Sequence, residues 1–385
     1  MRTAAILSLL PTLACAQVEQ GAPNTDFSPA FEHQTRAPAL PDTPVTVATF
    51  ADGLAQPWGI AALPDGSFLV TEKVGTLRRV TDDGGLSDPI LGVPEVSNRN
   101  QGGLLDVAIA PDFETSGVIY LTYAKPVDGG TVTAAARAVL AGDALSDVTD
   151  IFVQEPPSQT YMHYGSRVVP TDDGMVYITT GEHSSEATRV LAQDLETTYG
   201  KIIRLNADGT VPDDNPFVGT EGIDSIWSFG HRNVQGAALG PDGAIWTMEH
   251  GPAGGDELNR PQAGLNYGWP VISYGVNYNG SPVGSGQSAM EGMEQPVYYW
   301  DPVIAPGGIA FYDGPYADWQ GDLLVAGLNP GSLTRLKLDG DRVTGEERLL
   351  QDVGRIRDVE VLDDGDVLVL IDADPGQILR VTPGR

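Results

Sequence analysis

Four of the five histidines in this 385-residue chain stand in glycine-rich segments. They are His163, His183, His231 and His250. A neutral imidazole accepts a proton near neutral pH, so these segments are candidates for acid–base chemistry. No two of these histidines have the spacing of a metal-ligand motif, and a zinc or iron cluster is therefore only a secondary alternative.

Several common catalytic signatures are absent from the sequence. It has no GxSxG nucleophile elbow, no HExxH motif, no GxxxxGK[ST] phosphate loop and no GxGxxG after an expected strand. These absences argue against the hydrolase, phosphate-loop and dinucleotide-binding classes that depend on such motifs. A site in this chain has to be assembled from loops that converge in space.

Arg355 and Arg357 are the clearest candidates for anion binding. The chain has 52 acidic and only 22 basic residues, a formal charge of −30, so a local concentration of arginine needs a reason. Residues two apart on an extended strand point the same way, and two guanidiniums on one face repel unless an anion lies between them. A bound carboxylate would be that anion, or a paired aspartate such as Asp358 would neutralise one arginine.

The elements that must position these side chains follow a repeat. A turn rich in Asp and Gly precedes a short β-branched and aromatic run six times, at intervals of about 45 to 80 residues. The runs are Ser67–Thr71, Val118–Thr122, Met175–Thr179, Ala244–Met248, Asp322–Ala326 and Asp366–Leu370. Second runs such as Gly75–Val80 follow several of them, with apolar and polar residues in alternation.

This repeat predicts an all-β fold, a six-bladed β-propeller of four-stranded antiparallel blades. The early strand near Val45 should complete the last blade and close the ring, which removes exposed sheet edges. Helical periodicity is nearly absent, although residues 188–198 could form one short helix. A β-sandwich or a two-domain β protein is the alternative architecture.

The N-terminus has the layout of a secretory signal. A basic start and an apolar stretch precede a small-residue triplet that ends at Ala16, so residues 1–16 are predicted to be a signal peptide. The protein is then expected to be periplasmic or secreted. Lipid anchoring at Cys15 is the alternative, and because Cys15 is the only cysteine, an internal disulfide is excluded.

Residues 17–43 are polar and dotted with proline, which predicts a flexible leader ahead of a propeller domain over 44–385. No apolar run after the signal approaches the roughly 20 residues that a membrane-spanning helix needs. The strong negative charge disfavours nucleic acid and anionic lipid as partners.

An ordered series of motifs resembles the soluble aldose and glucose dehydrogenases from about Leu54 to Val381. The motifs are Pro57–Ile60, Gln101–Leu105, Tyr161–Arg167, the Gly181–Glu182 pair, Gly230–Gly236, Glu249–Pro252, Asp256–Asn259 and Asn266–Pro270. Each motif alone is weak, and their order along the chain makes the resemblance specific. It implies a quinoprotein that oxidises an aldose at the anomeric carbon to the lactone, with calcium-bound pyrroloquinoline quinone as hydride acceptor.

The resemblance also implies catalytic roles for three residues. His163 would be the general base, Glu182 the carboxylate that orients it, and Arg232 the cation that stabilises charge on the quinone. The family usually has Asp where this chain has Glu182, so a longer side chain must make the same contact. Without the surrounding motifs, a structural histidine and a surface ion pair would explain the same residues.

Five further positions match cofactor contacts of the family. Arg355 and Arg357 match its cofactor arginines, and Gln101 and Asn233 match its amide contacts. Asn329 stands where the glucose-specific members have a cofactor-contacting lysine. One cationic contact to the quinone is therefore missing, or is supplied from elsewhere.

Calcium is implied by the same resemblance. The backbone carbonyls of Gly251 and Pro252 match the ligands of the ion that bridges quinone and protein, and such oxygens are the donors that calcium prefers. Glu257 and the backbone of Tyr267 would take part in a second, structural calcium site. No EF-hand loop is present.

Two other functions stay open because the chain departs from the family pattern, including at Met162, where the glucose-specific members have Asp. One is a propeller that binds partners after losing its cofactor, similar to hedgehog-interacting proteins, and the other is a metal-dependent lactonase. The expected partner is a small sugar substrate, with a cytochrome or a quinone as electron acceptor by analogy. The preferred sugar and the oligomeric state are not readable from the sequence.

Overall fold

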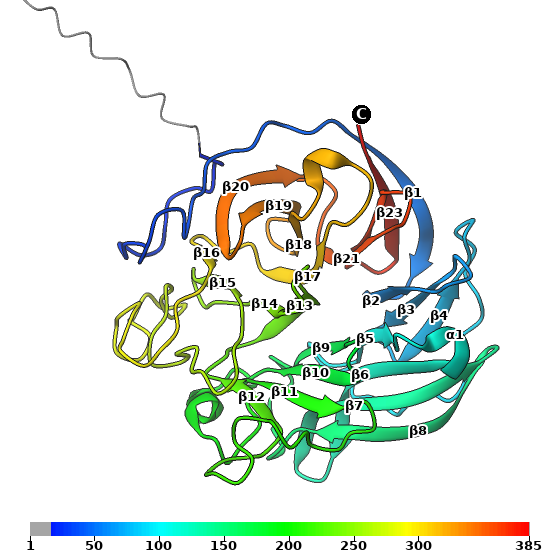
Figure 1. The fold of residues 1–385 in the computed structure, drawn as a ribbon, viewed down its shortest axis with the longest axis horizontal. Helices are drawn as coiled ribbons and strands as arrows, with labels where there is room; N and C mark the ends of the chain where they lie inside the picture. The colour runs from blue at the N-terminus through cyan, green and yellow to red at the C-terminus, as the bar shows by residue number, and fades with distance from the viewer. Residues whose placement is uncertain (1–16, 385) are drawn as a thin grey trace, which may run out of the picture.

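Six antiparallel sheets stand around a common centre in the computed structural model, which describes residues 17–384 (Figure 1). The innermost strand of each sheet contacts the innermost strands of both neighbouring sheets, so the ring is closed. In chain order, the innermost strands of blades 1 to 6 are β2 (Pro57–Ala62), β5 (Leu104–Ile109), β9 (Gly165–Pro170), β13 (Val234–Leu239), β17 (Pro306–Phe311) and β21 (Ile356–Val361). The predicted six-bladed propeller is confirmed.

Each of the six apolar runs forms the second strand of its blade. These strands are β3 (Phe68–Glu72), β6 (Val118–Val127), β10 (Met175–Thr180), β14 (Ile245–Glu249), β18 (Leu323–Gly327) and β22 (Val367–Ile371). Most of their residues are buried, as in β18 and β22, because both faces of the sheet pack against neighbouring blades. Burial on both faces produces continuous apolar runs instead of alternation, which made the second strands visible in the sequence.

The third and outer strands complete the blades. The third strands are β4 (Thr76–Val80), β7 (Gly130–Ala141), β11 (Lys201–Asn206), β15 (Asp256–Asn259), β19 (Ser332–Asp339) and β23 (Gly376–Pro383). The outer strands are β8 (Ala144–Val153), β12 (Ile226–Phe229), β16 (Tyr298–Trp300), β20 (Arg342–Leu349) and β1 (Val45–Leu54). Five blades therefore have the predicted four strands within the described residues.

Blade 1 departs from that prediction, because only β2, β3 and β4 form regular strands there. The segment 85–91 runs beside β4 without becoming a fourth strand. Its contacts include hydrogen bonds from the backbone N–H of Ser87 to the carbonyl of Arg79 at 2.9 Å and from Ile90 to Leu77 at 2.8 Å. The edge of this blade is thus covered by irregular chain.

The ring is closed by the two ends of the described chain. β1 pairs antiparallel with β23 along its whole length, from Val45 opposite Pro383 to Leu54 opposite Gly376. β1 is therefore the outer strand of blade 6, whose other strands come from the C-terminus. The predicted closure by the strand near Val45 is confirmed.

Residues 17–43 lie against blades 4 and 5, where the sequence predicted a flexible leader. Ala37 is fully buried in the apolar cluster between blades 4 and 5, and the backbone N–H of Asn24 donates to the Asp301 carboxylate at 2.9 Å. The polar composition concealed this packing because hydrogen bonds to blade side chains hold the segment, without an apolar periodicity of its own. The predicted signal peptide, residues 1–16, lies outside the described residues.

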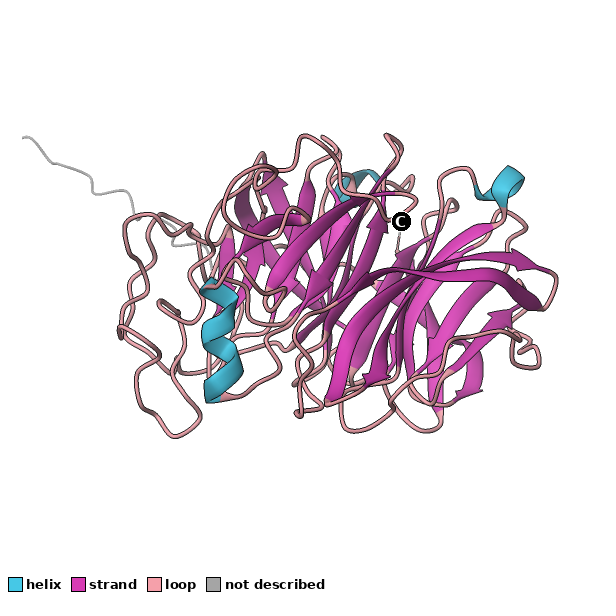
Figure 2. Ribbon diagram, turned by 90° about the horizontal axis from the view of Figure 1, so that it is seen from below, coloured by secondary structure: helices cyan, strands magenta, loops and turns pink. Residues whose placement is uncertain are grey.

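Helices are short and confined to connections between strands (Figure 2). They are α1 (Phe113–Ser116), α2 (Glu186–Arg189) and the 3₁₀ turns η1 (Val190–Gln193) and η2 (Ala317–Trp319). α2 and η1 begin two residues before the expected helix and end before it does. None of the helices in the described part of the chain is long and apolar enough to cross a membrane.

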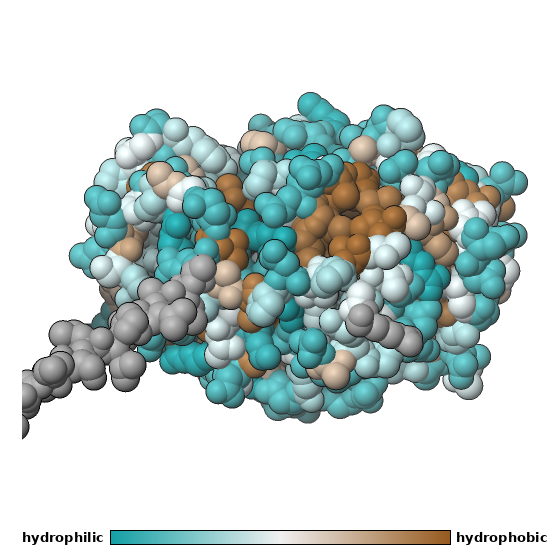
Figure 3. All heavy atoms as spheres, turned by 90° about the horizontal axis from the view of Figure 1, so that it is seen from above, coloured by the Kyte–Doolittle hydropathy of each residue, from teal (hydrophilic) through white to brown (hydrophobic). Residues whose placement is uncertain are grey.

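One side of the ring shows a mainly hydrophilic surface with a limited apolar area (Figure 3).

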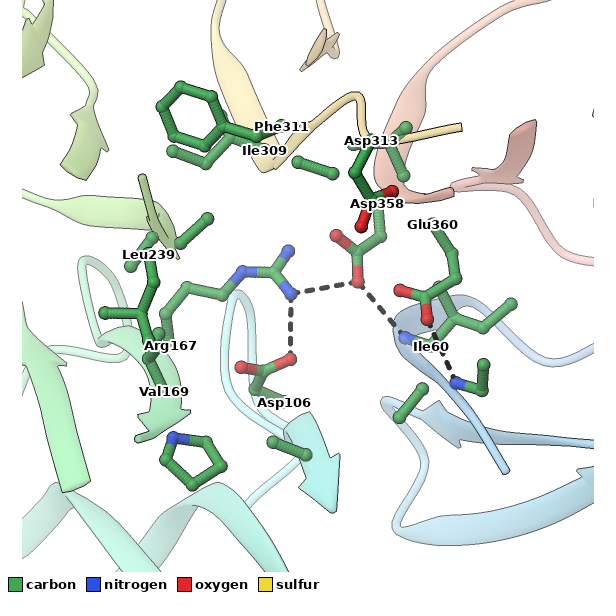
Figure 4. Close-up of a pocket in the computed structure, with 18 of the residues that line it drawn as sticks. Ile60, Asp106, Arg167, Val169, Leu239, Ile309, Phe311, Asp313, Asp358 and Glu360 are labelled. Carbon is green, nitrogen blue, oxygen red and sulfur yellow. Dashed lines mark hydrogen bonds and ion pairs between the residues drawn. The ribbon is translucent and has the colours of Figure 1, made fainter. Parts of the chain in front are cut away.

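The centre of the ring is blocked by a buried ion cluster (Figure 4). Arg167 on β9 donates through Nη1 to Asp106 Oδ1 at 2.8 Å and to Asp358 Oδ2 at 2.9 Å, and so ties blades 2, 3 and 6 together. Below the cluster, a cavity of about 760 Å³ occupies the C-terminal ends of the innermost strands, with Glu360 on its wall. The candidate site lies at the opposite end, where the innermost strands begin.

Candidate active site

His163 and Glu182 meet because they flank two paired strands. His163 precedes β9, Glu182 follows β10, and β9 and β10 run antiparallel. His163 Nδ1 lies 2.9 Å from Glu182 Oε1, and the second carboxylate oxygen accepts a hydrogen bond from the backbone N–H of Ser184 at 2.6 Å. The approach requires glycine at position 181, since a Cβ there would come 1.9 Å from the carbonyl oxygen of His163. The longer arm of glutamate therefore does reach the imidazole.

The imidazole of His163 is held neutral in a defined tautomer. Its residue is 7% exposed, and burial together with the guanidinium of Arg232 lowers the pKa of His163 despite the opposing effect of Glu182. A carboxylate accepts hydrogen bonds only, so Nδ1 carries the proton and Nε2 keeps its lone pair. Gln101 fixes the backbone, because its Oε1 accepts from the N–H of His163 at 2.8 Å. Nε2 is thus available to accept a proton.

Arg232 and Asn233 enter the site from the start of β13. The Arg232 backbone N–H donates to Glu249 Oε2 at 2.6 Å, and its Nη1 donates to the carbonyl of His250 at 2.9 Å. The guanidinium lies 5.1 Å from the ring centre of Trp269, and its buried Nε has no hydrogen-bond partner among residues 17–384. Asn233 Oδ1 accepts from the backbone of Gly165 at 3.0 Å, which joins blades 3 and 4. Arg232 therefore keeps unused donor capacity.

Arg355 and Arg357 point the same way, and the anion between them is Asp372. Asp372 Oδ2 accepts from Nη2 of Arg355 at 3.1 Å and from Nη2 of Arg357 at 2.7 Å. Burial acts to raise the pKa of Asp372, but the two arginines together outweigh it and lower that pKa. The aspartate considered from the sequence, Asp358, pairs with Arg167 instead.

Gln235 and His250 connect these parts into one site. Gln235 Oε1 accepts from Arg357 Nη1 at 2.9 Å and lies 3.1 Å from His250 Nε2, while the His250 carbonyl accepts from Arg232. The pKa of His250 is well below its ordinary value because of burial and of the nearby Arg232 and Arg357. A series of contacts therefore brings His163, Arg232, Arg357 and, through Asp372, Arg355 to the same end of the ring. Asn329 lies in the exposed turn after β18, beside the same mouth.

Gln235 and Asp372 belong to the site but were not predicted from the sequence. Gln235 is two residues after Asn233 on β13, in the motif that drew attention to Arg232. Asp372 directly follows the second strand of its blade, as Glu182 nearly does in blade 3. The signal available in the sequence for Asp372 was an acidic residue at the end of the second strand of a blade.

All four residues expected to bind calcium line one small cavity. These residues are Gly251, Pro252, Glu257 and Tyr267, which the sequence analysis had divided between two sites. The cavity has about 10 Å³ of internal space, comparable to one water molecule. Burial and the neighbouring Glu249 raise the pKa of Glu257 well above its ordinary value.

Oxygen atoms suited to a hard cation surround this cavity. They include the carboxylates of Glu249 and Glu257, which line the cavity and which both accept hydrogen bonds from Nδ2 of the buried Asn259, at 3.0 Å and 3.3 Å. Within residues 17–384, no three His, Cys, Asp or Glu side chains are arranged as a metal site. A cation here would depend on backbone and amide oxygens as well as carboxylates, which are ligands that calcium accepts.

A second cavity, of about 330 Å³, adjoins Glu182, Arg232 and Trp269. Hydroxyl and amide groups contribute much of its wall: Ser184, Ser185, Asn277, Tyr278, Asn279 and Ser281. Arg189 Nη1 donates to Asn277 Oδ1 at 2.9 Å and so joins the loop after β10 to the loop before β16. Such groups can exchange hydrogen bonds with a polyhydroxylated ligand.

A closed ring of six blades with a buried imidazole–carboxylate pair and three guanidiniums at one mouth has the features of a six-bladed propeller enzyme. The chain belongs to the glucose/sorbosone dehydrogenase family, whose model matches residues 54–380. The family resemblance stated from the motifs is confirmed.

Named relatives extend over nearly the whole chain. The aldose sugar dehydrogenase YliI of Escherichia coli (strain K12) is 42% identical, covering 90% of this chain and 94% of that protein. The apo-form crystal structure of the soluble aldose sugar dehydrogenase from Escherichia coli has a TM-score of 0.85 at 41% identity, covering 89% of this chain and 100% of that one. The PQQ-bound form of the aldose sugar dehydrogenase from Streptomyces coelicolor has a TM-score of 0.74 at 29% identity, with 90% and 100% covered.

Proposed function

We propose that this protein oxidises aldose sugars at the anomeric carbon to the lactone, with pyrroloquinoline quinone and calcium as cofactors. The single observation that carries the proposal is the contact of His163 with Glu182 beside Arg232. A neutral imidazole with a free Nε2, oriented by a carboxylate, is what proton removal from a sugar hydroxyl requires. The adjoining polar cavity offers room for the sugar.

The reaction removes two electrons and two protons from the sugar, one proton together with the electron pair as hydride. His163 Nε2 takes the proton of the anomeric hydroxyl, while Glu182 stabilises the imidazolium that forms. The quinone, when bound, supplies the acceptor for the hydride from the anomeric carbon. Arg232 places positive charge where negative charge develops, and its unpartnered Nε can donate a hydrogen bond there.

The proposed cofactor carries three carboxylates, and the site has the groups to hold them. Arg355 and Arg357 share a single carboxylate, Asp372, so the cluster retains positive charge. Planar guanidiniums bind carboxylates with two parallel hydrogen bonds. Gln101 and Asn233 lie next to His163 and Gly165 and are proposed as amide contacts, and Asn329 as a contact from the rim.

Calcium is proposed to occupy the region of Gly251, Pro252, Glu257 and Tyr267. The shared cavity and the two carboxylates that line it, Glu249 and Glu257, support a hard cation there. Positive charge would also offset the repulsion between Glu257 and Glu249. Whether one ion or two bind is left to metal analysis of the purified protein.

Turnover also requires an acceptor that reoxidises the bound cofactor. We propose a soluble cytochrome or a quinone for this role, in the periplasm or outside the cell. The signal-like residues 1–16 support the location. The acceptor classes are proposed by analogy, with a cytochrome taking the two electrons in two one-electron steps. Comparing candidate acceptors in the same assay separates the two acceptor classes.

The deciding experiment is reconstitution of the purified chain. With calcium and pyrroloquinoline quinone, we expect the absorbance of bound cofactor to appear, and glucose or xylose should then drive reduction of an artificial dye. Prior removal of metal with EDTA should abolish dye reduction, and calcium should restore it. Lactone hydrolysis without any electron acceptor would instead identify a lactonase, and absence of quinone binding would identify a non-catalytic propeller.

Glu182→Gln should lower kcat of the reconstituted enzyme on the order of 100-fold. The amide can donate an N–H to Nδ1 of His163 and thereby place the imidazole proton on Nε2, the atom that has to accept the substrate's proton. Steady-state dye reduction measures the effect. Glu196→Gln is the matched control, because Glu196 is an exposed residue further along the same connection between β10 and β11 and does not line the cavity. A Glu182→Gln enzyme with unchanged kcat would contradict the orienting role.

A further inference from the structure

Positive charge is concentrated at one mouth of an acidic protein. The chain has 22 basic residues against 52 acidic ones, yet Arg355 and Arg357 bind the same carboxylate, Asp372, and Lys73 lies beside that segment. The backbone N–H of Lys73 donates to the carbonyl of Gln56 at 3.1 Å, and the N–H of Gln56 donates to the carbonyl of Ala373, next to Asp372, at 3.1 Å. Lys73 comes from the turn between β3 and β4 of blade 1, and the two arginines come from blade 6. Three cations and one anion leave a net charge of about +2, which repels itself unless a further anion binds.

The ammonium group of Lys73 has unused donors. Its Nζ donates to the backbone carbonyl of Asn100 at 3.0 Å and forms no ion pair within the described residues. Burial is the main cause that lowers the pKa of Lys73, and the field of Arg355 and Arg357 adds to it while Asp372 opposes it. An ammonium group has three donors, so two remain for a ligand.

The position of Lys73 places it beside both halves of the proposed cofactor site. Asn100, its partner, directly precedes Gln101, whose side chain holds the backbone of His163. On its other side are Asp372 and the two arginines that bind it. A carboxylate between these groups would meet cations from two blades.

We propose that Lys73 binds a carboxylate of pyrroloquinoline quinone and supplies the cationic contact that Asn329 cannot make. The inference rests on the proposed function and extends it to a residue outside the motifs that carry the family resemblance. A charge-assisted hydrogen bond from a half-buried ammonium is stronger than one between neutral groups. Lys73 thereby compensates from blade 1 for a lysine missing from blade 5.

The test is a titration of the full, calcium-loaded chain with pyrroloquinoline quinone. Binding is followed by quenching of tryptophan fluorescence, since Trp58 and Trp269 lie under the guanidiniums of Arg357 and Arg232. Lys73→Met should raise Kd roughly 10- to 100-fold, as expected for loss of one charge-assisted hydrogen bond. Lys73→Arg should stay near the wild-type Kd. Adding Asn329→Lys to the Lys73→Met variant should recover much of the affinity.

Lys337→Met is the matched control, because it removes the same charge from an exposed position on β19. It should leave Kd unchanged, and the melting temperature of the cofactor-free protein should be the same in all variants. An unchanged Kd in Lys73→Met would overturn the inference, as would a loss of affinity that only follows a lowered melting temperature. Failure of the wild-type chain to bind the quinone would instead remove the proposed function, and this inference with it.

Discussion

His163→Ala is expected to lower kcat for aldose oxidation roughly 10³- to 10⁴-fold, the effect of losing a positioned general base. The neighbouring His183 is a poor replacement, because burial is the main cause that lowers its pKa to about 3. The Glu182 carboxylate stays held by the backbone N–H of Ser184, at the position from which it oriented the imidazole. The measurement is single-turnover reduction of bound cofactor by sugar. Quinone binding should change little, because the variant retains the arginine cluster.

His33→Ala provides the control, since His33 is an exposed histidine outside the blades, and it should leave turnover unchanged. The wild-type pH profile offers a second check. The base must be unprotonated, and the pKa of His163 lies below its ordinary 6.5, so kcat should rise with pH only below that value and be level above it. Undiminished single-turnover reduction in His163→Ala would show that another group takes the proton.

Arg167→Met should destabilise the fold by about 3–5 kcal/mol, the usual cost of breaking a buried ion cluster from one side. The substitution leaves Asp106 and Asp358 facing each other in the centre of the ring, without their shared cation. Thermal unfolding of the cofactor-free protein should show a melting temperature lower by several degrees. Arg79→Met is the control, because the partner of Arg79 is Asp65, 65% exposed, and it should cost less than about 1 kcal/mol.

The loss in Arg167→Met should depend on pH in a defined direction. Burial already raises the pKa of Asp106 to about 6 although Arg167 opposes the shift, so removal of Arg167 raises that pKa further. A carboxyl group with a folded pKa above its unfolded value of 3.8 destabilises the fold increasingly as pH rises from the unfolded pKa to the folded pKa, and by a constant amount above the folded pKa. The difference from wild type should therefore be small near pH 4 and largest above pH 7. A deficit independent of pH would show that the lost packing of Arg167, not its charge, is responsible.

The sequence was sufficient to predict the architecture because each blade of a propeller repeats the same sequence pattern. The second strands are buried on both faces and appear as six apolar runs, of which Asp366–Leu370 is typical. Outer strands carry weaker patterns, so the irregular edge at 85–91 was not visible. The packing of residues 17–43 could not be predicted because it depends on distant partners. Asp301, for example, is more than 250 residues away from this segment.

The site was predictable in its members but not in its pairings. Motifs identified His163, Glu182 and Arg232, and the structure brings them together. The partner of the arginine pair was not identified, because contacts such as that between Arg357 and Gln235 join residues 122 positions apart and depend on how blades face each other. Lys73 escaped notice because a single lysine in a turn carries no pattern.

Because β1 pairs with β23, the ring can close only after the C-terminal strands have been synthesised. The chain delivers one strand of blade 6 first and the other three last, so five blades can assemble while the ring still has a gap. Arg355, Arg357 and Asp372 belong to that final portion. A chain that ends some thirty residues early would therefore be an open, inactive arc that exposes the apolar sheet faces of blades 5 and 1 at the gap, and not a weakened enzyme.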